Sequence, residues 1–183
     1  MLTRVRWATF LMGAWVAGSL IVSVVGSENF YTIDRLLSGS PNQTFTSMVE
    51  QLGRPHAREL LRYLSSELNR FYFQLWNAAQ LVSGVIVLWL MRRTPAAARI
   101  RLTVAGMLAI VALMTVWLAP EIEVIGRSLD FVPRDPPPPA LRQFGILHAA
   151  YVVLEGFKLI AGVVVAAWMT RSEKMEGTWQ AQP

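Results

Sequence analysis

The sequence predicts an all-α integral membrane protein, an antiparallel four-helix bundle with an amphipathic helix in its first extracytoplasmic loop. Three observations predict this class. Four long segments are almost free of charge, one short loop is rich in arginine, and tryptophans gather at the segment ends. The chain has 183 residues, 54% of them hydrophobic and 16% charged, whereas soluble domains carry about 25% charged residues.

Each apolar segment is long enough to cross a bilayer, which takes about 20 helical residues. The segments cover residues 7–25, 71–91, 102–119 and 144–169. The first follows two arginines, as in a signal peptide, but it is longer than the usual apolar region and lacks a clean A-x-A cleavage site. We therefore expect a retained first helix, a single four-span domain over residues 1–174, and a flexible cytoplasmic tail over residues 175–183.

The connection over residues 26–70 carries the predicted amphipathic helix. In the stretch HARELLRYLSSELNR, leucines recur at helical spacing while Arg58 and Arg62 lie on the other side. Upstream, Ser47 and Glu50 match a capping box. We expect this helix to lie on the membrane surface or to cap the bundle; it can also run straight into the second span.

The loop RRTPAAARIR between the second and third spans predicts the orientation. It holds four arginines and no acid, and short arginine-rich loops stay in the cytoplasm. Both termini are then cytoplasmic, and we expect a bacterial plasma (inner) membrane protein. The tryptophans agree with an aromatic belt at each interface. Those expected at the inner ends are Trp7, Trp89 and Trp168, and those at the outer ends are Trp76 and Trp117.

Charge and cysteine content exclude several other classes. The net charge is +5, but the arginines flank apolar segments instead of one folded face, so no nucleic-acid partner is expected. The absence of cysteine excludes disulfides, thiolate metal sites and cysteine nucleophiles. No glycine-rich phosphate loop, HExxH or GxSxG occurs, so we expect no enzyme activity and no catalytic residues.

The fourth apolar segment carries ionisable residues on one face. At about 100° per residue, one side of a helix would carry His148, Tyr151, Glu155, Lys158 and Gly162. A charge at the bilayer centre costs at least ~2.5–3.5 kcal/mol on insertion scales. Glu155 and Lys158 are three residues apart and can pair on one helix. This pair either fixes the orientation of the helix or forms a site for a proton, an ion or a small ligand.

The second span offers a matching polar face. Its amides recur every three residues and fall within an arc of about 120°; they are Gln74, Asn77 and Gln80. Such amides are typical of hydrogen bonds between membrane helices. We interpret them either as contacts that join helices or as part of an intramembrane polar binding site shared with the fourth span.

His148 raises the question of a cofactor, because a histidine in a membrane helix can bind haem iron or copper. The other histidine, His56, is expected in the outer loop before the second span. We therefore predict no metal and no cofactor, with a haem held by His148 alone as the alternative.

Short motifs in order along the chain carry a family resemblance. They are GAWVAG in the first span, an aromatic–leucine element at 30–37, an aromatic approach to the second span at 60–72, WLAP at 117–120, and LRQFGILHAAYVVLEG at the start of the fourth span. Together they resemble the transmembrane-protein-205-like group, whose bacterial members carry a domain of unknown function. His148 matches the family pattern, whereas Glu155 stands where that pattern has asparagine. The resemblance implies a four-helix membrane domain and no established activity.

From these observations we expect a non-enzymatic small membrane protein that acts in a membrane complex or in small-solute or stress handling. Its expected partners are the lipid bilayer and other membrane proteins or a second copy of the chain. Two alternatives remain: a transporter-like or proton-relay role through Glu155 and Lys158, and a haem protein.

Overall fold

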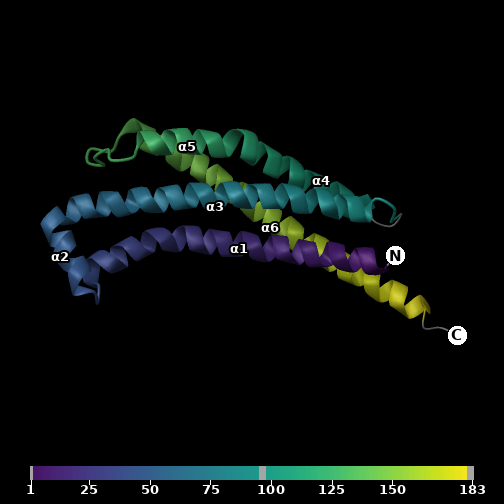
Figure 1. Cartoon of the computed structure of the whole chain (residues 1–183). Coiled ribbons are helices and arrows are strands. Elements are labelled where there is room, and N and C mark those ends of the chain that lie inside the picture. The colour runs from purple at the N-terminus through teal and green to yellow at the C-terminus, as the bar shows by residue number, and fades with distance from the viewer. Residues whose placement is uncertain (1, 95–97, 181–183) are drawn as a thin grey trace.

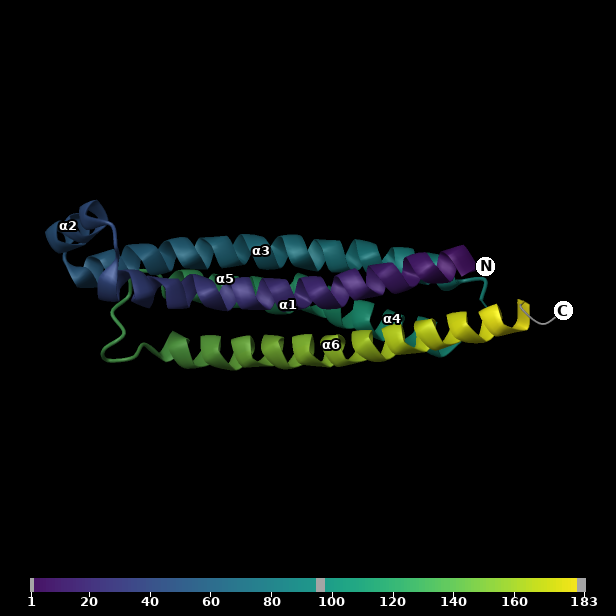
Figure 2. The same cartoon turned by 90° about the horizontal axis from the view of Figure 1, so that it is seen from below.

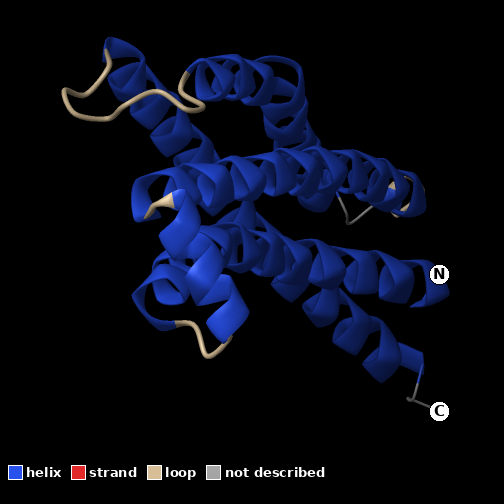
Figure 3. Cartoon of the chain, turned by 60° about the vertical axis from the view of Figure 1, so that its left-hand side comes forward, coloured by secondary structure: helices blue, strands red, loops and turns tan. Residues whose placement is uncertain are grey.

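The computed structural model describes residues 2–94 and 98–180, and within them it contains helices and no strand. The elements are α1 (Leu2–Gly39), α2 (Gln43–Leu52), α3 (Arg54–Met91), α4 (Ala98–Leu113), the π-helical turn η2 (Met114–Leu118), α5 (Ala119–Ser128) and α6 (Pro139–Gln180). Elements α4, η2 and α5 follow one another without a break, and a loop over residues 129–138 leads to α6 (Figure 3). This confirms the predicted all-α class.

Four helical stretches are long and apolar enough to cross a membrane: Thr3–Gly39, Arg54–Met91, Ala98–Ser128 and Pro139–Arg171. This confirms the four candidate spans. Only 22–28% of the most apolar window of each stretch is buried inside the chain. Large side chains such as Ile21, Val85 and Leu102 are more than half exposed. Because exposed apolar area is unfavourable in water by about 25 cal/mol per Å², these surfaces are suited to a lipid environment.

Each long helix packs against two of the others. Helix α1 packs against α3 and α6, and α4 packs against the same two helices. Figure 2 shows α3 along one side and α6 along the opposite side, with α1 and α4 between them. The start of α1, the end of α3 and the start of α4 lie at one end, while α2 and the α5–α6 connection lie at the other (Figure 1). Helices α3 and α6 therefore face each other across the centre.

The predicted amphipathic helix is not a separate element, because residues 56–70 form the first part of the continuous helix α3. Nothing interrupts α3 after the proline in its first turn. The separate helix is α2, which Asn42 caps by accepting a hydrogen bond from the Phe45 backbone N–H. Ser47 and Glu50 lie inside α2, so the predicted capping box is wrong. Gly53, with φ 83°, makes the turn between α2 and α3.

The third span passes through Pro120 without ending. Pro120 lies in the first turn of α5, directly after the π-helical turn. Proline has no N–H to donate to the preceding turn. In the wider π turn, the Ala119 N–H donates to the Met114 carbonyl, so the backbone pairs with a shifted partner and stays helical. Helix α6 likewise continues to Gln180, through part of the predicted tail; residues 181–183 lie outside the described residues.

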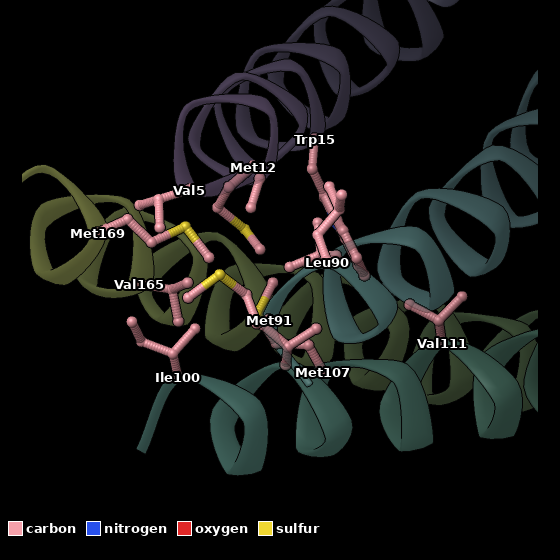
Figure 4. Packing of buried hydrophobic residues seen from close by; sticks show 13 residues of the cluster. Val5, Met12, Trp15, Leu90, Met91, Ile100, Met107, Val111, Val165 and Met169 are labelled. Carbon is pink, nitrogen blue, oxygen red and sulfur yellow. The ribbon is translucent and has the colours of Figure 1, made fainter. Parts of the chain in front are cut away.

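An apolar core fills the half of the molecule that contains the start of α1. Its buried members come from α1, α3, α4 and α6. Figure 4 shows Met12, Met91, Met107 and Met169 converging between the four helices. Methionine is flexible and polarizable, so it fills irregular gaps. The polar groups described next lie beyond this core.

Candidate functional site

A buried ion pair forms the centre of the site. Lys158, on α6, has 0% of its side chain exposed, and its Nζ lies 2.7 Å from Glu155 Oε2, whose side chain is 11% exposed. Lys158 Nζ also donates a hydrogen bond of 2.6 Å to Gln80 Oε1 on α3. Because α3 and α6 face each other across the centre, this bond joins the two helices through the interior.

Gln80 also binds the first helix. Its Oε1 accepts a second hydrogen bond, of 2.9 Å, from Trp15 Nε1, so one amide oxygen links α1, α3 and α6. The sequence patterns predicted no role for Trp15. The position of Trp15 in the middle of the first span could have indicated this bond. Most tryptophans in membrane spans lie near the interfaces, and an indole N–H that is buried between them needs a hydrogen-bond acceptor.

A second polar contact lies closer to the α2 end. The buried Tyr151 hydroxyl donates a hydrogen bond of 3.2 Å to Asn77 Oδ1. Its ring meets Phe73 edge-on, with centroids 5.6 Å apart. This contact again joins α6 to α3, about two turns from Lys158.

Three side-chain atoms of this network have no hydrogen bond among the described residues. Gln80 Nε2 and Glu155 Oε1 are buried and have no hydrogen bond. Glu155 Oε2 has no hydrogen bond either, although Lys158 lies 2.7 Å away. The contact between Lys158 Nζ and Glu155 Oε2 is therefore an ion pair that lacks the geometry of a hydrogen bond. Unsatisfied buried polar atoms are rare and often mark a place for water, an ion or a proton.

The structure separates the predicted site residues into two groups. Tyr151, Glu155 and Lys158 meet Asn77 and Gln80 inside the bundle. Gly162, on the same predicted face of the fourth span, packs closely against α1. A Cβ added at Gly162 would lie 2.8 Å from the Val16 side chain.

Gln74 and His148 lie outside this network. Gln74 is exposed and donates to Glu123 Oε2 on α5 at 3.0 Å. His148 is exposed and stacks on Phe144, with centroids 5.8 Å apart. Among the described residues, no group of three or more His, Asp or Glu could hold a metal ion. A haem held by His148 stays a prediction.

Gln74 and His148 line a cavity of about 290 Å³ at the α2 end of the bundle. The cavity lies where α3, α5 and α6 meet, and the buried Tyr151 forms its floor. Aromatic side chains make up much of the remaining wall; they are Phe30, Tyr63, Phe73, Phe131 and Phe144. The Tyr151 hydroxyl therefore connects the cavity with the polar contacts between α3 and α6.

Ion pairs neutralise most charges around this cavity. Arg70 pairs with Glu67 and, at 3.0 Å, with Asp130. Arg127 pairs with Glu67 at 2.7 Å and with Glu123 at 2.9 Å. These bonds hold α5 and the segment after it against α3. They also leave few lining charges free to meet a ligand.

Arg62 and Arg134 also line the cavity. Within the described residues, neither guanidinium forms an ion pair with a carboxylate. Burial lowers the pKa of the Arg134 guanidinium, and the positive charge of Arg62 lowers it further. Arginine stays protonated at any physiological pH, so the two side chains present like charges to the same space.

Comparisons with protein-family models, with curated proteins and with solved structures find no match to this chain. The resemblance to the transmembrane-protein-205-like group therefore stays a prediction.

Proposed function

We propose that this protein is a non-enzymatic integral membrane protein that crosses the bilayer four times as an antiparallel bundle and binds a small solute at its extracytoplasmic end. The cavity above Tyr151 is the observation that carries this proposal. Its volume of about 290 Å³ is close to the lower end of the ~300–1,000 Å³ typical of small-molecule sites. Its mixture of aromatic walls and a few polar groups is also typical of such sites.

The apolar core supports a binding role over a proton relay. A relay through Glu155 and Lys158 needs further polar groups or water towards the opposite face. On that side the buried cluster consists of valine, alanine, methionine, leucine, isoleucine and tryptophan side chains, with no titratable group. Towards the start of α1 the ion pair is thus followed by apolar side chains, and of the polar network only Tyr151 lines the cavity.

The orientation rests on the acid-free arginine loop, which favours a cytoplasmic α3–α4 connection. The natural chain contains no cysteine, so single-cysteine variants give an unambiguous test. An impermeant maleimide should label Asp135→Cys in intact cells and should label Thr94→Cys only after the membrane is permeabilised. The opposite pattern would overturn the orientation.

Solute binding can be tested with the neutral fluorophore N-phenyl-1-naphthylamine on protein in nanodiscs, with empty nanodiscs as the blank. Gly126 lines the cavity, and a Cβ there would lie 3.3 Å from Phe144 and 3.5 Å from Arg70. Gly126→Leu should therefore fill the cavity. Gly156→Leu is the matched control, because a Cβ at Gly156 meets nothing within 4 Å.

We expect saturable fluorescence enhancement with the natural protein and with Gly156→Leu, and affinity at least about tenfold weaker with Gly126→Leu. A tenfold loss corresponds to about 1.4 kcal/mol of binding free energy. Equal enhancement by all three proteins would show that the fluorophore binds elsewhere and would overturn the proposed site.

A further inference from the structure

We propose that the cavity selects an anionic amphiphile, a molecule with one negatively charged head group and a single apolar chain or ring system. This inference rests on the proposed function and adds the chemical class of the solute. It depends on the charges that remain unpaired around the cavity, on the distribution of polar and apolar groups along it, and on its size.

The unpaired charges favour an anion. Arg62 and Arg134 line the cavity without a paired carboxylate, while Glu59 is the lining acid without an ion pair among the described residues. These three groups sum to one positive charge, while the ion-paired groups beside the cavity, two arginines and three carboxylates, sum to one negative charge. The preference for an anion therefore depends on the two unpaired guanidinium groups that line the same cavity. An anion between the two guanidinium groups would relieve their mutual repulsion and form charge-assisted hydrogen bonds, which are roughly twice as strong as neutral ones.

Charged and aromatic lining residues differ in their exposure. Arg134 is exposed and Arg62 partly exposed, whereas Tyr151 is only 7% exposed. Phe73 packs on the Tyr151 ring, so the most buried part of the lining is aromatic. A bound amphiphile would therefore place its head group near the arginines and its apolar part against these rings.

The size of the cavity limits the apolar part. At about 290 Å³ it is smaller than most pockets for drug-sized ligands, so one chain or one fused ring system fits and a complete two-chain phospholipid does not. The same head-group chemistry occurs in free single-chain acids and in anionic phospholipids. The experiment must therefore separate these two sources.

The first test compares two fluorophores with the same aromatic body in nanodiscs of zwitterionic lipid. 8-Anilino-1-naphthalenesulfonate carries a sulfonate, and N-phenyl-1-naphthylamine is its neutral counterpart. We expect the natural protein to bind the anionic probe about tenfold more tightly, a difference of about 1.4 kcal/mol, because the sulfonate can accept charge-assisted hydrogen bonds. In the double variant Arg62→Gln/Arg134→Gln, this preference should fall to about one.

Two further variants control for unspecific effects. Arg58 is on α3, as Arg62 is, but it pairs with Asp34 at 2.8 Å and does not line the cavity. Arg58→Gln should therefore leave the preference for the anionic probe unchanged. Glu59→Gln removes the opposing charge and should strengthen binding of the anionic probe severalfold while leaving the neutral probe unaffected. This gain is measurable even if the double arginine variant does not fold.

The source is tested by competition. Laurate should displace the anionic probe, 1-dodecanol should not, and exchanging part of the nanodisc lipid for phosphatidylglycerol should displace little. Displacement by phosphatidylglycerol alone would overturn the single-chain assignment. Equal affinity of the natural protein for both fluorophores would overturn the anion preference and leave the proposed function intact. If neither fluorophore binds, both proposals are overturned.

Discussion

Replacing Lys158 by methionine tests whether the central ion pair stabilises the helix arrangement. Methionine keeps much of the length of the lysine side chain but cannot donate a hydrogen bond. The variant loses the 2.6 Å bond to Gln80 and the 2.7 Å contact with Glu155. The buried carboxylate of Glu155 is then left without a partner, because neither of its oxygens has a hydrogen bond in the intact network.

Removing one member of a buried pair typically costs about 3–5 kcal/mol, because the remaining charge is uncompensated. We expect a loss in this range for Lys158→Met, whose natural side chain is 0% exposed. Replacing both members by apolar residues is often neutral or stabilising. The double variant Lys158→Met/Glu155→Leu should therefore recover most of the lost free energy of unfolding.

The free energy of unfolding can be measured in mild-detergent micelles by titration with sodium dodecyl sulfate, followed by circular dichroism. Arg93→Met is the matched control for loss of a cation, because Arg93 is exposed and belongs to no ion pair among the described residues. A loss for Lys158→Met no larger than that of the control would refute the reasoning. So would a double variant that is less stable than the single one.

Two other predictions concern helix packing and the ion pairs beside the cavity. A Cβ at Gly18 would lie 2.0 Å from the Trp76 ring. Gly18→Ala should therefore reduce the free energy of unfolding by about 1–3 kcal/mol and change the tryptophan emission. A Cβ at Gly13 would meet nothing within 4 Å, so Gly13→Ala should be neutral or stabilising by about 0.5–1 kcal/mol. Arg70→Gln should reduce the thermal stability of the detergent-solubilised protein more than Arg127→Gln, because the Arg70 side chain is 12% exposed and that of Arg127 is 48% exposed. Similar effects within either pair would contradict these predictions.

Much of the fold could be predicted because the relevant signals are local. Uninterrupted apolar segments identify the candidate spans without knowledge of their neighbours. Helical periodicity also places Glu155 and Lys158 on the same face, three residues apart, and the structure shows them in contact. Element boundaries were less predictable. A proline such as Pro120 typically ends or kinks a helix, whereas the π-helical turn before it keeps the backbone helical.

The partners of the polar residues were harder to predict, because they depend on how whole helices pack. Periodicity places Gln74 on the same side as Asn77 and Gln80, yet Gln74 bonds to Glu123. No local pattern reveals that Glu123 on α5 comes within hydrogen-bond distance of Gln74. Trp15 was missed for a similar reason, since its bond to Gln80 joins residues 65 positions apart.

The sequence by itself determined that the chain forms long apolar helices and that one of them carries a Glu–Lys pair, since both properties follow from composition and from spacing within a single helix. Only the tertiary structure decided that α3 and α6 face each other, that Gln80 joins three helices, and that aromatic and charged side chains from α3, α5 and α6 enclose a cavity above Tyr151. These features arise from contacts between distant segments. Their geometry depends on the rotation and register of every packed helix, which hydropathy and periodicity leave open.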